Sequence, residues 1–152
     1  MKTRLSGLWL MMLTLVLAAT VHAAPGAGWK GSGGWGPQGS YGRMYDPATV
    51  ETVRGKVVEV LRMTPMKGMG AGIHLKLKTE TGPVSVHLGP AWYIERLDLR
   101  IEKGDQVEVR GSRVTFNGKP ALIAAEVKKG DEVLKLRDDS GIPVWSGWRR
   151  GQ

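Results

Sequence analysis

The sequence of 152 residues contains no cysteine. This absence excludes disulfide bonds, thiolate nucleophiles, covalently attached haem, iron–sulfur clusters and cysteine-ligated zinc. The fold must therefore be stabilised by a hydrophobic core and by pairing between strands.

The sequence also lacks the patterns by which many enzymes are recognised. It has no phosphate-binding loop and no arrangement of Ser, His and Asp typical of nucleophilic catalysis. Its acidic residues fall mainly in turns or at the ends of expected strands, where they have a structural role. We therefore expect a binding protein and not an enzyme.

An apolar run of the ~20 residues that a membrane-spanning helix needs is missing as well. The longest run, residues 8–19, follows a basic N-terminus and precedes Val21-His22-Ala23. This three-part pattern predicts a secretory signal peptide at residues 1–23, cleaved after Ala23. The alternative is an uncleaved anchor helix. Cleavage leaves a periplasmic or secreted protein with no transmembrane segment.

Positive charge predominates, since 22 Lys and Arg residues stand against 14 Asp and Glu residues. Lys2 and Arg4 belong to the predicted signal peptide, and the remainder is still basic. Outside the cytoplasm such a protein favours anionic partners, such as a membrane surface or an anionic polymer. A merely solvated cationic surface is the alternative. Genomic DNA is not an expected partner, because an exported protein rarely meets it.

Glycine is dense between residues 24 and 47, where no apolar periodicity offsets the entropy of ordering the chain. We interpret this segment as a flexible arm rich in Gly and Trp. Trp29, Trp35 and Tyr41 within it are alternatively anchors that dock on a partner or back on the domain.

From residue 48 to residue 150 the pattern is that of one β-rich domain. Asn117-Gly118 is a strong hairpin signal, and Gly55 suits a bulge or a sharp bend. We expect strands at 50–61, 73–78, 84–88, 106–116 and 121–127, a short helix at 90–98, and a further hairpin from 132 to 145. This order predicts an all-β fold with a small helix, namely a five-stranded OB-fold-like Greek-key barrel with an additional C-terminal hairpin.

Three segments carry a resemblance to known families: Val53–Val57, Gly104–Ser112 and Ala124–Val127. They resemble the strand signatures of bacterial periplasmic OB-fold proteins. The motif HLGPAWY at residues 87–93 and the ending WSGWRR are similar to those of small exported OB-fold proteins that are often labelled DNA-binding. The resemblance covers roughly residues 48–150 and implies the fold. It leaves the activity open, because OB folds host many ligands.

Methionines form the most distinctive loop of the sequence. Met63, Met66 and Met69 recur at a spacing of three, and thioether sulfurs are ligands that suit Cu(I). A two-residue turn at Glu80-Thr81 would pair His74 with His87 across two strands, on the outer face and beside this loop. The five residues together predict a copper site. The alternatives are adaptable apolar filler and two surface histidines.

Basic and aromatic residues form a second set of candidate ligand-binding residues. They are Arg62, Lys67, Lys76, Lys78, Trp92, Tyr93, Arg110 and Arg113. Cations beside aromatic rings on an OB barrel are typical of binding to single-stranded nucleic acid. Phe116, however, stands alone in its hairpin, and Trp92 and Tyr93 are better explained as a plug of the barrel end.

These observations predict an exported, non-catalytic OB-fold module of the bacterial envelope that binds a protein partner or a small ligand. Copper binding through the methionines and histidines is the first alternative. Binding of nucleic acid or another anionic polymer is the second.

Overall fold

The computed structural model describes residues 32–147 of the chain. The predicted signal peptide, Trp29 and the ending from residue 148 lie outside these residues. Six strands are present: β1 (Val50–Met63), β2 (Gly72–Thr79), β3 (Gly82–Pro90), β4 (Gln106–Phe116), β5 (Lys119–Lys129) and β6 (Glu132–Lys135). One α-helix, α1 (Ala91–Ile94), and the 3-10 helices η2 (Gly42–Met44), η3 (Pro47–Thr49) and η4 (Val144–Gly147) accompany them.

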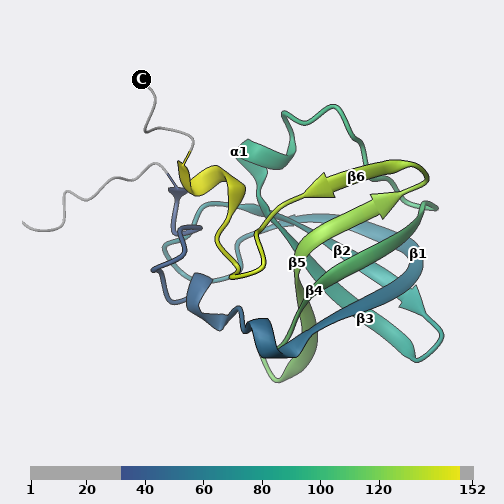
Figure 1. Ribbon diagram of the computed structural model, residues 1–152, viewed down its shortest axis with the longest axis horizontal. Helices are drawn as coiled ribbons and strands as arrows, with labels where there is room; N and C mark the ends of the chain where they lie inside the picture. The colour runs from purple at the N-terminus through teal and green to yellow at the C-terminus, as the bar shows by residue number, and fades with distance from the viewer. Residues whose placement is uncertain (1–31, 148–152) are drawn as a thin grey trace, which may run out of the picture.

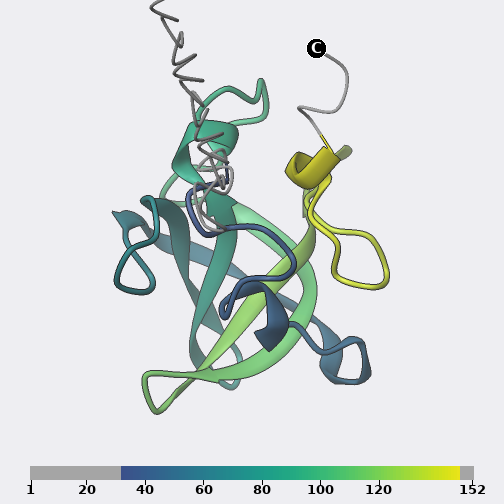
Figure 2. The same cartoon turned by 90° about the vertical axis from the view of Figure 1, so that its left-hand side faces the viewer.

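The first five strands close into a barrel (Figures 1 and 2). Neighbouring strands follow the order β3-β2-β1-β4-β5 in antiparallel pairs, and a short parallel pairing of β3 with β5 closes the ring. The long strand β1 curves so that its first half pairs with β4 and its second half with β2. The predicted five-stranded OB-fold-like barrel is confirmed.

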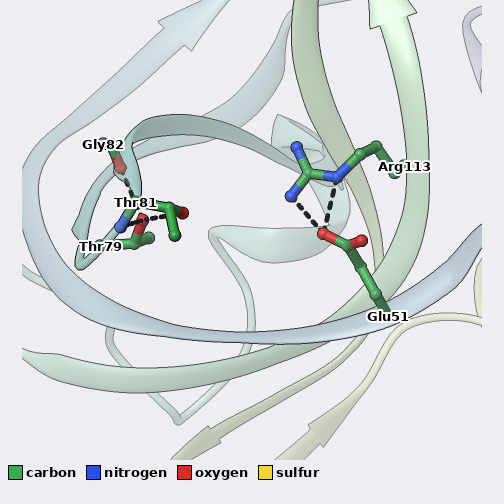
Figure 3. Close-up of polar contacts among 5 residues, drawn as sticks. All are labelled: Glu51, Thr79, Thr81, Gly82 and Arg113. Atoms are coloured by element: carbon green, nitrogen blue, oxygen red, sulfur yellow. Dashed lines mark hydrogen bonds and ion pairs between the residues drawn. The ribbon is translucent and has the colours of Figure 1, made fainter.

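Alternation of apolar and polar residues sets the register of the hairpin formed by β2 and β3. Leu75 pairs with Val86 and Leu77 with Val84, and all four side chains are buried inside the barrel. The hydroxyl of Thr79 donates to the carbonyl of Gly82 at 2.6 Å and accepts from the amide of Thr81 at 3.3 Å, as Figure 3 shows. The turn is thereby held at the predicted two residues, and a one-residue slip would turn the apolar set outward.

Of the two alternatives predicted for Gly55, a bulge or a sharp bend, the bulge is wrong, because the bulge in β1 lies between Val57 and Glu59. Gly55 instead stands where β1 passes from β4 to β2, and a Cβ there would lie 2.6 Å from the carbonyl oxygen of Lys78. The helix is confined to Ala91–Ile94 and does not reach residue 98.

The C-terminal hairpin is built differently from the prediction. β6 pairs with β5 and extends the sheet beyond the barrel. Residues 142–145, which were expected to pair with this strand, contribute only a single bridge from Pro143 to Arg137 before η4 begins. Within residues 32–147, no helix is both long and apolar enough to cross a bilayer.

Residues 32–47 are packed against the barrel, so of the two alternatives for this segment it is docking of Trp35 and Tyr41 back on the domain that describes this part. Trp35 and Tyr41 are 1% and 2% exposed. The indole nitrogen of Trp35 donates to the carbonyl of Gly70 at 3.0 Å, and its own carbonyl accepts from the indole nitrogen of Trp145 at 3.0 Å. Burial of these large rings offsets the entropy of ordering a glycine-rich segment. We call residues 32–46 the N-terminal strap.

Candidate functional site

The two predicted histidines meet across β2 and β3. His74 pairs with His87, and their rings stack with centroids 3.9 Å apart and planes 10° from parallel. Each side chain is 1% exposed, because the N-terminal strap covers this outer face of the barrel. The predicted pairing is therefore confirmed, and the expectation of two surface histidines is wrong.

Aromatic rings enclose the histidine pair. The hydroxyl of Tyr41 is 2.9 Å from Nδ1 of His87, and the ring of Tyr41 stacks on the same histidine. Trp35 approaches His74 with its edge, and Phe116 approaches His87 edge-on at 4.8 Å. Phe116, isolated in the sequence, thus belongs to a cluster that only the folded strap completes.

Burial determines the protonation of this cluster. Desolvation lowers the pKa of His74 from 6.5 to about 4. Desolvation, with smaller contributions from protonation of His74 and from the charge of Arg137, lowers the pKa of His87 to about 3. Both rings are therefore neutral at pH 7. Neither ring nitrogen of His74 has a hydrogen-bond partner within residues 32–147.

The three methionines do not share one environment. Met63 is 40% exposed at the end of β1, whereas Met66 and Met69 are partly buried against the core. Imidazole lone pairs lie in the ring plane, so two stacked rings cannot both direct them at one ion. No group of three or more His, Asp or Glu side chains suited to a metal occurs among the described residues.

Most of the predicted cationic residues are paired with carboxylates. Arg62 contacts Glu95 and Lys76 contacts Glu59. Arg110 contacts Asp139, and Arg113 contacts Glu51, as Figure 3 shows. Within the described part of the chain, Lys67 and Lys78 have no such partner. Because paired charges attract anions weakly, this set does not form one continuous anion-binding face.

Trp92 and Tyr93 lie on α1 and are partly buried against the core. The ring of Tyr93 packs against Trp145 with centroids 5.4 Å apart. This is the packing expected of residues that close the end of a barrel, which was the preferred interpretation of both.

Arg137 is a buried cation that the sequence did not reveal. Its side chain is 6% exposed, Nη1 donates to the carbonyls of Leu88 and Ala124, and the guanidinium lies 4.9 Å from the ring centroid of Trp145. Burial lowers the pKa of Arg137. No carboxylate pairs with it among residues 32–147. It ties the C-terminal segment to β3 and β5, and no pattern in the sequence distinguishes it from a surface arginine.

A cavity opens at the end of the barrel beside α1. Its volume is about 120 Å³, and its lining is mainly aliphatic. The aliphatic lining includes Val60, Ile73, Leu75, Leu88, Leu99 and Leu134. Glu95 and Arg100 are the charged residues of the lining.

An open groove adjoins this cavity where β1 separates from the segment before β4. Val57 makes backbone hydrogen bonds of 2.8 Å to Asp105 and 2.7 Å to Gly104. Beyond it lies a hollow of about 630 Å³, lined by Val58, Glu59, Val60, Ile101, Glu102 and Lys103. Val60 lines both the cavity and the groove. We call the two together the barrel-end groove.

Sequence reasoning missed the barrel-end groove. The signal that could have found it is the run Val57-Val58, followed by Val60, which breaks the alternation of β1. The bulge after Val57 allows one valine to enter the core while Val58 and Val60 stay 37% and 40% exposed.

Comparison with known proteins adds a family to this geometry. None of the curated proteins with which the chain was compared matches it. A family model described as the MamS/MamX magnetosome protein family matches residues 49–134. The match begins next to β1 and ends within β6, so it includes the whole barrel. The chain thus belongs to the MamS/MamX magnetosome protein family.

Proposed function

We propose that this protein is an exported, non-catalytic accessory module of the magnetosome that binds a partner protein at its barrel-end groove. The family supports the magnetosome as its location, and the predicted signal peptide supports export. The observation that carries the binding role is the barrel-end groove itself, because exposed valines line an open hollow that leads into an apolar cavity.

The size of the cavity favours a protein partner over a free small ligand. Pockets for drug-sized molecules measure roughly 300–1,000 Å³. The cavity here is about 120 Å³, which is room for one small apolar group, while the groove beside it is larger, at about 630 Å³, and open. One anchoring side chain with its backbone in the groove matches this shape. The cationic face favoured by the nucleic-acid alternative is largely neutralised by ion pairs.

Photo-crosslinking in the native cells tests this proposal. A photoreactive residue at Val60 is expected to give an adduct with one magnetosome protein, identified by mass spectrometry. The same residue at Lys119, the exposed first residue of β5, should give none, because the turn between β4 and β5 lies away from α1 (Figure 1). Adducts of equal yield at both positions, or absence of the protein from purified magnetosomes, would contradict the proposal.

Copper binding is a second candidate, and His74 is the observation that favours it. Its two ring nitrogens are neutral at pH 7 and have no hydrogen-bond partner among the described residues. A Cu(I) ion held by His74 and the sulfurs of Met66 and Met69 would use one histidine and so avoid the conflict of the stacked rings.

Titration with Cu(I) against a competing chelator measures this affinity. We expect binding tighter than about 1 μM, weakened at least tenfold when Met66 and Met69 are both replaced by Leu. Met44→Leu, in the strap, is the matched control. Binding weaker than micromolar, or affinity unchanged in the double variant, ends the copper proposal.

A further inference from the structure

The barrel-end groove is bounded by a free sheet edge. β4 pairs with β1 only from Val50 to Lys56, and β2 occupies the opposite side of β1 from Lys56 to Met63. Among the described strands, none therefore covers the outer side of β1 from Val58 onward. Unpaired backbone amides and carbonyls on such an edge are a template for another strand.

The free part of β1 carries apolar side chains beside two charged ones, Glu59 and Arg62, which are engaged in ion pairs with Lys76 and Glu95. A bulge follows Val57, but lysine and proline, which commonly protect an edge, are absent from residues 58–63. Val58, Val60 and Met63 are instead exposed by 37–40% on the free part of β1. Their exposure favours an apolar partner along this strand.

From this geometry we infer that the barrel-end groove receives an extended segment of a partner protein, which adds as a strand to β1 and places one aliphatic side chain in the cavity. The inference rests on the proposed binding function and names the kind of partner. Backbone hydrogen bonds to β1 would supply affinity, and the cavity would supply specificity.

The volume of the cavity restricts the anchoring side chain. An engineered protein cavity of about 150 Å³ holds benzene. The cavity here is smaller, at about 120 Å³, so it favours Leu, Ile or Val over the larger rings of Phe, Tyr and Trp.

Charge around the barrel-end groove indicates an acidic residue next to the anchor. Glu95 and Glu59 are engaged by Arg62 and Lys76. Arg100 at the cavity and Lys103 in the groove have no carboxylate partner within residues 32–147, and Glu102 is the one lining carboxylate without a cation in contact. The local excess of one positive charge favours a segment with an Asp or Glu beside its aliphatic anchor.

A capped synthetic hexapeptide, Thr-Asp-Leu-Thr-Val-Thr, is the probe. NMR titration of the purified protein is expected to shift the amides of residues 58–63 and to slow their hydrogen exchange at least tenfold. Replacing the peptide's leucine by phenylalanine, or methylating alternate backbone nitrogens, should weaken binding at least tenfold. Val58→Lys in the protein should do the same, whereas Val133→Lys, at a comparably exposed valine of β6, should not.

The inference is overturned if millimolar peptide leaves residues 58–63 unshifted, or if phenylalanine binds as well as leucine. It is also overturned if the protein is a dimer joined through β1, because a second copy would then occupy the edge. These outcomes are separable from failure of the proposed function. If the Val60 adduct forms but the NMR titration shows no strand pairing, only the proposed strand addition is contradicted. If the Val60 adduct does not form, the proposed binding at the barrel-end groove is contradicted.

Discussion

Trp35→Ala is expected to lower the free energy of unfolding by about 3–5 kcal/mol, as for other buried large aromatic residues. The indole is 1% exposed and contacts Tyr41 and His74 through its ring. The substitution also removes its hydrogen bond to the carbonyl of Gly70. Urea denaturation followed by near-UV circular dichroism measures the change.

The matched control for this prediction is Val133→Ala, which removes an exposed apolar side chain and should change stability by less than about 0.5 kcal/mol. Limited proteolysis adds a readout specific to the strap, since Trp35→Ala should speed cleavage within residues 32–46 before the barrel unfolds. A loss below about 1 kcal/mol, with unchanged proteolysis, would show that the strap is not part of the folded unit.

Acidification is expected to destabilise the protein by several kcal/mol between pH 6.5 and pH 4. Folding lowers the pKa of His74 from 6.5 to about 4 and that of His87 to about 3. The unfolded chain therefore binds more protons than the native state in this window. The free energy of unfolding consequently decreases as the pH is lowered. The stabilising effect of neutral rings is complete above pH 6.5. Each histidine then removes about 1.4 kcal/mol per pH unit until its folded pKa is reached.

Urea denaturation at a series of pH values measures how steeply the free energy of unfolding depends on pH. His74→Leu provides the control, because it removes one histidine and keeps the contribution of every carboxylate. In that variant the slope of the free energy of unfolding between pH 6 and pH 4.5 should fall by about half. NMR titration of the ring protons in the unaltered protein gives the same pKa values directly. A native pKa near 6.5 for both histidines would mean that the strap does not bury them.

The sequence was sufficient to predict the succession of strands and turns along the chain, because alternation and turn signals are local properties. Asn117 and Gly118 have φ values of 51° and 75°, the left-handed conformation that the Asn-Gly pair was expected to adopt. The pairing of His74 with His87 also followed from parity, since side chains alternate with a period of two in any strand.

The candidate site could be predicted only in part. The pairing of the histidines was predicted correctly, but their burial was not, because it depends on a segment more than thirty residues away. Ion pairs such as Arg113 with Glu51 join residues far apart in sequence, so a list of cations did not reveal which charges are neutralised. The barrel-end groove arises where β1 leaves β4, which only the curvature of the closed barrel decides.

The N-terminal strap shows most clearly which structural features could not be predicted from the sequence. Its glycine content indicated flexibility, because the entropy of ordering is a local quantity that can be read from the sequence. What opposes that entropy is not local. Gly72 and Gly89 leave room on β2 and β3 for Trp35 and Trp145, and any Cβ at these positions would collide with the indole rings.

The sequence by itself therefore determined the β-barrel, the register of the hairpin formed by β2 and β3, and the absence of thiol chemistry, since each follows from residue type and spacing. Tertiary structure alone decided that the histidines are buried and neutral, that the strap is docked, and that one sheet edge stays open beside a cavity. Those features depend on which distant surfaces meet when the barrel closes, and no local pattern encodes that contact.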